Sequence, residues 1–274
     1  MLSSYILSLR EGLEAALILG IVLGALRQTH RRYLSASVWL GAGSAALISL
    51  VTAILLTRLG LELKDPAEAI FEAITMLLAA AILTWMVFWM SQRARNLKRD
   101  LESGVQKASQ TGKWSLFGLA FLAVLREGVE LALFLTAAVF SSGTRQAVLG
   151  AFFGLGTSAF LGWFLFATTL RLDLKRFFQI TGILLIFFAA GLVAHSFHAL
   201  NELGWIPPVI EHIWNLNPLL NDQSTLGQLL AALFGYNGSP SLTEVLAYAL
   251  YFGVVALGLQ WAGSRSSQAA QRQA

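Results

Sequence analysis

The 274-residue chain contains no cysteine, and only 12% of its residues are charged. The absence of cysteine excludes disulfides, thiolate metal sites, iron–sulfur clusters and cysteine nucleophiles. A soluble domain of this size carries roughly twice this fraction of charged residues. Because 56% of the residues are hydrophobic and the mean hydropathy is +0.66, the composition is that of an integral membrane protein.

Several functional classes lack their sequence signals. No GxxxxGK[ST] loop occurs, so ATP hydrolysis is not expected. A GxGxxA pattern at Gly41–Ala46 lies inside a hydrophobic run, so we attribute it to helix packing rather than to dinucleotide binding. Basic residues are distributed between loops, which argues against nucleic-acid binding. The first 26 residues lack a basic start and contain Arg10, Glu11 and Glu14, which predicts a helix of the mature protein rather than a signal peptide.

The hydrophobic runs predict an all-α membrane protein with seven transmembrane helices. A bilayer core requires about 20 residues per helix, and each run is long enough, although charges interrupt the first and the fourth. The expected spans are Leu2–Leu26, Leu34–Thr57, Ala67–Met90, Trp114–Phe140, Gln146–Leu170, Phe177–Leu200 and Thr243–Ala262. We expect residues 1–264 to form one transmembrane domain, followed by a short polar tail at 265–274. An outer loop at 201–242 contains an amphipathic stretch near Leu226–Phe234, typical of interfacial or re-entrant structure.

The distribution of charge between the loops predicts the orientation. Seven spans place the two termini on opposite sides of the membrane. Fourteen of the 19 Lys and Arg residues lie on the side of the C-terminus, against Arg58, Lys64 and Arg145 on the other side. The positive-inside rule therefore places the N-terminus outside and the C-terminus in the cytoplasm. The outer face is acidic, which favours cations, and its acidic residues are Glu62, Asp65, Glu68, Glu202, Glu211, Asp222 and Glu244.

One motif occurs twice. Leu9–Leu17 reads LREGLEAAL and Leu125–Leu133 reads LREGVELAL, identical at seven of nine positions. Fainter similarities pair Gly41–Gly43 with Gly154–Gly156, Arg58 with Arg171, and Phe71 with Phe178. The repeating unit is therefore expected to be three spans, in residues 1–92 and 114–200, followed by a seventh helix at 243–262. An odd number of spans inverts the second copy, as in many secondary transporters whose site lies near the midplane at the repeat interface.

Each motif places one arginine and two glutamates inside an expected span. The six residues are Arg10, Glu11 and Glu14, and Arg126, Glu127 and Glu130. Six charges in hydrocarbon cost on the order of 15–20 kcal/mol before pairing. The i, i+3 spacing puts the two glutamates of a motif on one face, and the i, i+4 spacing lets the arginine reach the second glutamate. Both motifs lie about 13–18 Å from the outer surface at 1.5 Å per residue, so they would meet at one level.

The charges of the two motifs sum to −2, so a bound cation would complete the balance. Carboxylate oxygens are hard ligands that suit Mg, Ca, Mn or iron. Gly12 and Gly128, between the paired glutamates, would let helices approach closely, and the GxxxG spacings Gly20–Gly24 and Gly150–Gly154 fit helix packing. The alternative is a lattice of ion pairs that only holds the helices together.

Weaker candidates lie near the outer surface. Glu68 and Glu72, four residues apart at the start of span three, would form an outer relay, although solvation explains Glu72 almost as well. His195, His198 and Glu202 fall on one face at the end of span six, a spacing that suits a metal ion. We favour an ordinary interfacial pair for the two histidines, which leaves Glu202 as the better candidate.

Two REGxE motifs three spans apart resemble those of the oxidase-dependent iron permease family, and more closely its bacterial branch of ferrous iron permeases. The resemblance covers nearly the whole chain and includes Trp85–Met90, Ala189–Leu192, Glu202 and Phe234–Val245. It implies iron uptake, with iron as the transported substrate rather than a permanently bound cofactor. It also implies iron ligands at Glu11, Glu14, Glu127 and Glu130, with Arg10 and Arg126 as their orienting partners.

The resemblance further implies partners that this chain does not encode. These are a periplasmic iron-binding protein with a haem peroxidase, or in fungi a multicopper oxidase. The resulting hypothesis is a permease, not an enzyme, in the cytoplasmic (inner) membrane, which collects iron through Glu202, Glu72 and Glu68 and passes it to a midplane site. The alternatives are a transporter of another hard divalent cation such as Mn²⁺, an intramembrane carboxylate metalloprotein without transport, and a scaffold. A di-iron enzyme needs Glu-x-x-His motifs, which neither copy has.

Overall fold

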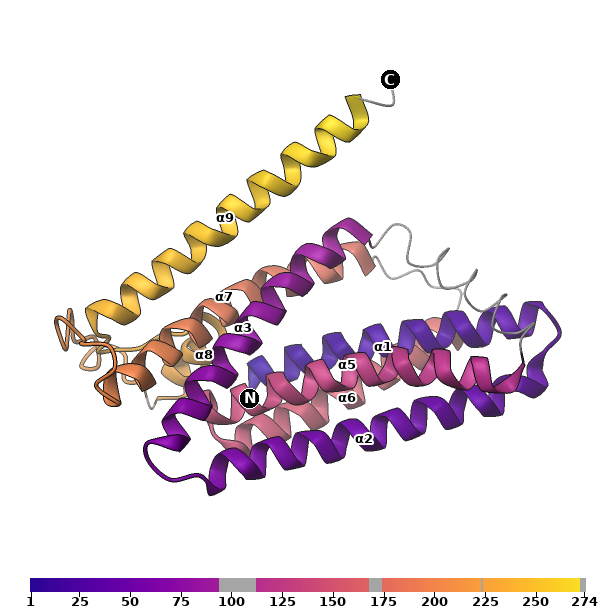
Figure 1. Cartoon of the computed structure of the whole chain (residues 1–274), viewed down its shortest axis with the longest axis horizontal. Coiled ribbons are helices and arrows are strands. Elements are labelled where there is room, and N and C mark those ends of the chain that lie inside the picture. The colour runs from indigo at the N-terminus through magenta and orange to yellow at the C-terminus, as the bar shows by residue number, and fades with distance from the viewer. Residues whose placement is uncertain (94–111, 168–173, 223, 272–274) are drawn as a thin grey trace. The chain divides into compact units, whose positions relative to one another are not determined.

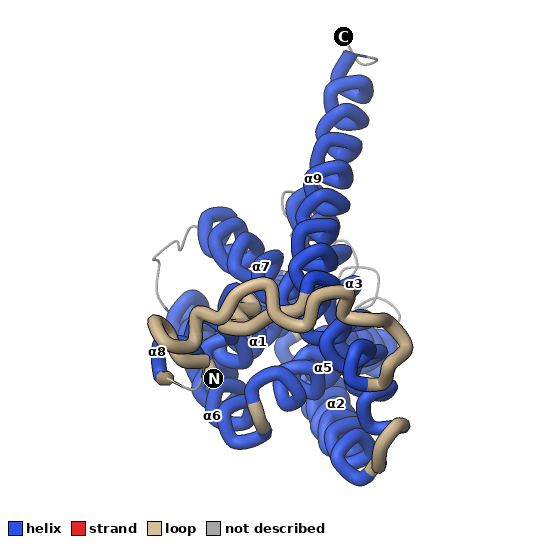
Figure 2. The backbone as a smooth tube through the Cα atoms, turned by 90° about the vertical axis from the view of Figure 1, so that its left-hand side faces the viewer, coloured by secondary structure: helices blue, strands red, loops and turns tan. Residues whose placement is uncertain are grey.

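The computed structural model describes residues 1–93, 112–167, 174–222 and 224–271. Within these ranges the regular secondary structure is entirely helical (Figures 1 and 2). The helices are α1 (Leu2–Gln28), the 3₁₀ turn η1 (Arg32–Leu34), α2 (Ser35–Glu62), α3 (Ala67–Arg93), α5 (Lys113–Ser142), α6 (Thr144–Ala167), α7 (Leu174–Glu202), α8 (Thr225–Phe234) and α9 (Leu242–Gln271).

Each expected span coincides with a long helix, except that residues 168–170 at the end of the fifth span lie outside the described residues. In the described part of the chain, five helices are long and apolar enough to cross a membrane, namely α2, α3, α6, α7 and α9. The other two, α1 and α5, have 27 and 30 residues and carry the charges of the repeated motif. This pattern of long apolar helices is that of a multi-pass membrane protein.

One sequence prediction is corrected by the structure, and another depends partly on residues that the structure does not describe. Helix α9 continues to Gln271, so most of the segment expected as a polar tail, residues 265–274, is helical. A large share of the charges that predicted the orientation lies outside the described residues, and so does one member of a proposed repeat pair, Arg171. The charged residues concerned are Arg95, Lys98, Arg99, Asp100, Glu102, Lys107, Arg171, Asp173 and Arg272.

The chain divides into two compact units. The first unit comprises Met1–Lys64 and Met90–Ile183, and it contains α1, α2, α5 and α6. The second unit comprises Asp65–Trp89 and Leu184–Ala274, and it contains most of α3 and α7 together with α8 and α9. Each unit thus draws equally on the two expected repeats, because the first takes two spans from each and the second takes the third.

In the first unit, α1 packs along α6 and α2 packs along α5, while α1 and α5 contact each other (Figure 1). Each close pair therefore joins the first helix of one repeat to the second helix of the other. At one end, Ile18, Val22 and Leu26 of α1 form a buried cluster with Val38 of α2 and Leu116 of α5. Burial of these side chains stabilises the contact between the two pairs at that end.

The two close pairs use glycine in the same way. A Cβ added to Gly41 on α2 would lie 2.5 Å from the carbonyl oxygen of Phe117 and 3.1 Å from the nitrogen of Phe121. A Cβ added to Gly150 on α6 would meet the carbonyl oxygen of Met1 and lie 3.0 Å from the nitrogen of Tyr5. Only glycine allows helix backbones to approach this closely.

These contacts determine the register between the repeats. Tyr5 and Phe121 occupy equivalent positions when the two REGxE motifs are superposed. Their contacts therefore align Leu40–Ala42 with Leu149–Ala151, both of which read LGA. The register expected from sequence, Gly41–Gly43 against Gly154–Gly156, is different, because it matched glycines by spacing rather than by the partner backbone that each one contacts.

The two GxxxG spacings have different roles. Gly150 and Gly154 both face α1, since a Cβ on Gly154 would lie 2.5 Å from the carbonyl oxygen of Tyr5. The expected packing role of this pair is therefore confirmed. Gly24 has no described atom within 4 Å of an added Cβ, and Gly20 and Gly24 instead line a cavity beside α1.

In the second unit, the predicted amphipathic stretch is confirmed as α8. The hydroxyl of Ser224 accepts a hydrogen bond from the N–H of Gly227 at 3.0 Å and caps the helix. Gly235 ends it with φ 67°, a left-handed conformation that favours glycine. An added Cβ on Gly191 of α7 would lie 2.6 Å from the Gly235 Cα, so α7 supports the end of α8 through a glycine–glycine contact.

The remaining helices of the second unit are joined by aromatic and hydroxyl contacts. The ring centroid of Phe187 on α7 lies 5.2 Å from that of Phe234 and 5.3 Å from that of Phe252, which connects α8 and α9. The hydroxyls of Thr84 on α3 and Tyr251 on α9 are 2.7 Å apart. These contacts connect α7 with α8 and α9, and α3 with α9.

We predict that Gly41→Ala destabilises the protein, because its methyl group would overlap the α5 backbone, and overpacking costs about 1–3 kcal/mol. Gly43→Ala is the matched control, since no described atom lies within 4 Å of its added Cβ. Thermal unfolding in detergent should show a lower midpoint for Gly41→Ala and no loss for Gly43→Ala. Equal midpoints would contradict the close contact between α2 and α5.

Candidate metal centre

The charged residues of the two motifs form the ion pairs that their spacing predicts. On α1, Arg10 Nε lies 3.3 Å from Glu14 Oε1. On α5, Arg126 Nε lies 3.0 Å from Glu130 Oε1 and 3.8 Å from Glu127 Oε1. The expected i, i+4 pairing is confirmed in both copies, and in the second copy the arginine reaches both glutamates.

The two ion pairs differ in burial. The side chains of Arg10 and Glu14 are 1% and 6% exposed, whereas those of Arg126 and Glu130 are 44% and 17% exposed. The near-identity of the motifs gives no sign of this difference. It arises from the surroundings of the two helices, so the copies offer one enclosed and one accessible arginine–glutamate pair.

Three glutamates from the two helices converge. Each of Glu11, Glu14 and Glu127 offers one carboxylate oxygen, and these oxygens all lie within 4.8 Å of one another. All three residues are buried. Of the four glutamates predicted as ligands, Glu130 is not in this group, and its Oε1 accepts a hydrogen bond from Arg126 Nε.

Several polar atoms of this cluster have no hydrogen-bond partner among the described residues. They include both carboxylate oxygens of Glu11, Oε2 of Glu127, Oε2 of Glu130 and Nη1 of Arg10. An ionised carboxylate buried without a partner is strongly unfavourable. A cation between the three carboxylates would supply the missing interactions, and oxygen ligands suit a hard or borderline ion such as Fe²⁺, Mn²⁺ or Mg²⁺.

Glycine and serine bring the helices to this distance. A Cβ added to Gly12 would lie 2.8 Å from the Cβ of Ser158 on α6, and one added to Gly128 would lie 2.5 Å from the Cβ of Ser49 on α2. The close approach expected at Gly12 and Gly128 is confirmed. Ser49 and Ser158 are equivalent in the register that the LGA segments define, so each motif glycine faces the matching serine of the other repeat.

A cavity of about 880 Å³ in the first unit reaches the cluster. Glu11 and Glu127 line it, together with Ser49 and Ser158, whose hydroxyls bond to carbonyl oxygens of their own helices. Its other walls are mostly aliphatic and aromatic. Sequence reasoning missed both serines, and the LGA alignment of the repeats is the signal that would have found them.

The candidates for an outer pathway all lie in the second unit. The Glu72 carboxylate is within electrostatic range of Glu202, Glu68 and His198. The ring centroids of His195 and His198 are 6.3 Å apart. His198 contacts Glu202 on its own helix. The sequence favoured an ordinary interfacial role for this histidine, whereas the structure gives it a carboxylate neighbour.

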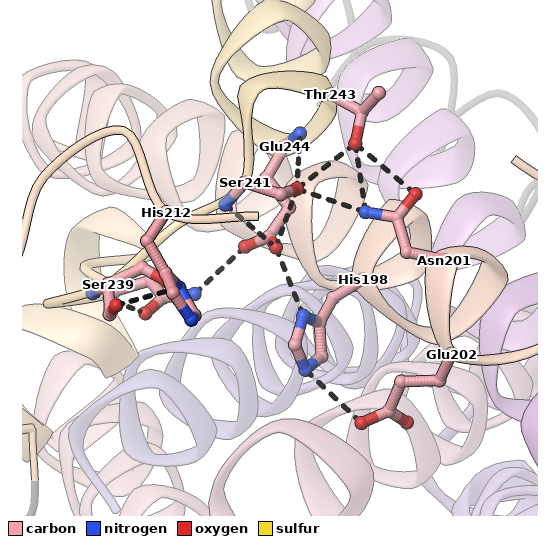
Figure 3. A network of polar contacts seen from close by, with 9 residues as sticks. His198, Asn201, Glu202, His212, Ser239, Ser241, Thr243 and Glu244 are labelled. Atoms are coloured by element: carbon pink, nitrogen blue, oxygen red, sulfur yellow. Dashed lines mark hydrogen bonds and ion pairs between the residues drawn. The ribbon is translucent and has the colours of Figure 1, made fainter. Parts of the chain in front are cut away.

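Figure 3 shows a polar network around His198 that the sequence did not predict. Glu244 at the start of α9 is bonded by His198, Asn237 and Ser241. Asn201 donates to the hydroxyls of Ser241 and Thr243 on the same helix end. The Ser241–Glu244 spacing is that of a capping box, S-x-x-E, which is the sequence signal that would have drawn attention to Glu244.

The unequal burial of the two arginines generates a prediction. Arg10→Gln should leave the Glu14 carboxylate buried without its partner, at a cost of about 3–5 kcal/mol. Arg126→Gln is the matched change in a less buried pair and should lower the stability by less. Unfolding midpoints in detergent without added metal compare the two, and equal losses would contradict the difference in burial.

The comparisons with known proteins agree with the resemblance that the motifs indicated. The sequence matches the iron permease FTR1 family over residues 1–266. The ferrous iron permease EfeU of Shigella sonnei (strain Ss046) is 36% identical over 272 residues, which cover 97% of this chain and 99% of the relative. No solved structure matches.

Two further relatives have the same name. The ferrous iron permease EfeU of Escherichia coli O6:K15:H31 (strain 536 / UPEC) is 37% identical over 250 residues, covering 90% of this chain and 91% of the relative. The ferrous iron permease EfeU of Yersinia pestis is 34% identical over 250 residues, covering 90% and 89%. Both the family match and these relatives extend over nearly all of the sequence, and the chain therefore belongs to the FTR1 iron permease family.

Proposed function

We propose that this chain is an iron permease that moves iron across the cytoplasmic (inner) membrane through the carboxylate cluster of the first unit. The observation that carries the proposal is the convergence of Glu11, Glu14 and Glu127, three buried carboxylates on two helices, within 4.8 Å. Membership of the FTR1 family and the names of its relatives supply iron as the substrate. The chain is a transporter and not an enzyme.

Charge supports a divalent ion at this centre. Three buried carboxylates beside the single buried guanidinium of Arg10 leave a net charge of −2 if all are ionised. A divalent cation neutralises this charge, and the carboxylate oxygens replace the water that the ion loses on entering hydrocarbon. A pure ion-pair lattice would leave this negative charge uncompensated unless carboxyl groups of the cluster carry protons.

The second arginine provides a route for release. Arg126 lies beside both Glu127 and Glu130, at 3.8 Å and 3.0 Å. While iron occupies Glu127, Arg126 pairs with Glu130. When the ion leaves, a small rotation of the guanidinium lets Arg126 neutralise Glu127, so the carboxylate is never left uncompensated. Glu130 then acts as a partner in exchange rather than as a permanent ligand.

The proposal includes the topology of the chain. Seven helices, including α1 and α5, cross the membrane with the N-terminus outside and the C-terminus in the cytoplasm. Residues 1–264 form one permease domain built from inverted repeats at 1–92 and 114–200 and a seventh helix. Two observations support this inverted repeat. The first helix of each repeat packs on the second helix of the other, and the LGA segments make equivalent contacts.

The proposal extends to the proteins around the permease. A periplasmic iron-binding protein and a haem peroxidase or an oxidase deliver iron to the acidic outer residues, among them Glu68, Glu72 and Glu202. The motif resemblance supports these partners. Their chemistry is separate from that of the chain itself, which we expect to move iron but not to oxidise it.

We predict that Glu14→Gln and Glu130→Gln each abolish iron uptake without removing the protein from the membrane. Glu14→Gln removes a charge from the cluster, and Glu130→Gln removes the exchange partner of Arg126. Liposomes containing the purified chain would be given radiolabelled Fe²⁺ under ascorbate, or chelated Fe³⁺. Glu62→Gln, at the exposed end of α2, is the matched control and should transport normally. Uptake at the wild-type rate by both motif variants would contradict the proposal.

The natural absence of cysteine gives a direct test of topology. Glu211→Cys and His30→Cys change exposed positions in the loops after α7 and α1. We predict that a membrane-impermeant maleimide labels Glu211→Cys in intact spheroplasts and labels His30→Cys only after permeabilisation. The unmodified chain provides the blank. Labelling of both positions, or of neither, before permeabilisation would contradict the proposed orientation.

A further inference from the structure

The network at the start of α9 fixes the donor role of one histidine nitrogen. Glu244 is buried and receives hydrogen bonds from the Ser241 N–H at 3.2 Å, the Ser241 hydroxyl at 2.9 Å and Asn237 Nδ2 at 2.8 Å. These groups donate, so the Glu244 carboxylate acts as an acceptor throughout. The fourth contact is with His198 Nδ1, 3.0 Å from Glu244 Oε1, and this nitrogen therefore donates as well.

A donating Nδ1 leaves Nε2 of the neutral ring with its lone pair. Nε2 faces Glu202 Oε1 at a distance of 3.4 Å (Figure 3). While the ring is neutral, two acceptor atoms thus point at each other, and either a proton or a metal ion between them would satisfy both. The arrangement in which a carboxylate holds one imidazole nitrogen and frees the other is the one that most metal-binding histidines have in proteins.

The distance between the two acceptors suits a metal ion. Ligands about 2.1 Å from a tetrahedral ion lie about 3.4 Å apart. The side chains of His198 and Glu202 are 48% and 68% exposed, so an ion can reach them from water. The Glu72 carboxylate on α3 is within electrostatic range of both side chains, so its negative charge also favours a cation there.

We propose that His198 Nε2 and Glu202 form a second metal site, which takes a divalent transition-metal ion from water. Glu244 is a positioning residue that orients the His198 ring and does not touch the ion. The site is distinct in chemistry from the carboxylate cluster of the first unit, because imidazole favours Fe²⁺, Co²⁺ or Zn²⁺ over Mg²⁺ and Ca²⁺.

This inference rests on the proposed function only for the use of the site, which is to capture the ion before transport. A site with few ligands and high exposure binds an ion more weakly than an enclosed one and releases it readily. It would also reject Mg²⁺ and Ca²⁺, which the three carboxylates of the first unit accept as hard ions. The His198–Glu202 site would then select the type of metal ion, and the carboxylate cluster of the first unit would enclose it.

The test uses Co²⁺ alone as the probe, titrated into the purified full chain in detergent after removal of bound metal. Four-coordinate Co²⁺ with a nitrogen ligand absorbs visible light strongly, whereas the hydrated ion absorbs weakly. We expect a saturable visible band for the wild type and for His212→Ala, the matched control, whose ring contacts Ser239 instead. We expect His198→Ala and Glu202→Gln to lose the band.

Glu244→Gln separates positioning from ligation. Glutamine can also occupy this place in a capping box, so α9 should still form. Loss of a carboxylate that orients a metal-binding histidine typically weakens metal binding about 10–100-fold, so the band should persist with a shifted midpoint. A band that His198→Ala and Glu202→Gln leave unchanged would overturn the proposal.

Glu14→Gln distinguishes this inference from the proposed function. Because Glu14 belongs to the first unit, its substitution should leave the Co²⁺ band intact even where iron uptake is lost. A band that depends on Glu14 and not on His198 would place the ion in the carboxylate cluster and would refute the second site. Retention of uptake in Glu14→Gln would count against the permease mechanism and leave the Co²⁺ result standing.

Discussion

The structure of the first unit depends on one electrostatic constraint, the burial of three carboxylates with one guanidinium. Glu11, Glu14 and Glu127 lie within 4.8 Å of one another, and Arg10 is the charged partner enclosed with them. Such a cluster is tolerated in an apolar interior only if a cation completes its charge or its members are protonated. The close helix contacts around it hold the carboxylates at this separation.

The pairing of helices between the repeats satisfies that constraint. Because α1 packs on α6 and α2 on α5, each motif glycine lies against a serine of the opposite repeat, Gly12 against Ser158 and Gly128 against Ser49. Small side chains on both sides keep the backbones close, which brings glutamates of the two copies into one cluster. The surroundings of the two copies differ nonetheless, because the Arg126 side chain is partly exposed and the Arg10 side chain is buried.

The second unit holds charge by a different means. Glu244 is buried as well, but hydrogen bonds from Ser241, Asn237 and His198 satisfy it, so no ion is required at that carboxylate. His198 Nε2 and Glu202, on the far side of the same imidazole ring, are exposed to water. Capture at an exposed imidazole and enclosure between buried carboxylates are therefore compatible with one chain, since the two environments differ in hydration and in ligand type.

The sequence by itself determined what depends on neighbours along the chain. Apolar runs predicted the seven long helices, the repeated motif predicted the Arg10–Glu14 and Arg126–Glu130 pairs, and the amphipathic pattern predicted α8, because helical periodicity is local. Only the tertiary structure decided which groups meet across large separations in sequence. It brought a carboxylate oxygen of Glu127 within 4.8 Å of Glu11 and Glu14, aligned the repeats at their LGA segments, and placed His198 against Glu244. Those contacts depend on which helix faces which, and residue spacing within a single helix carries no information about that.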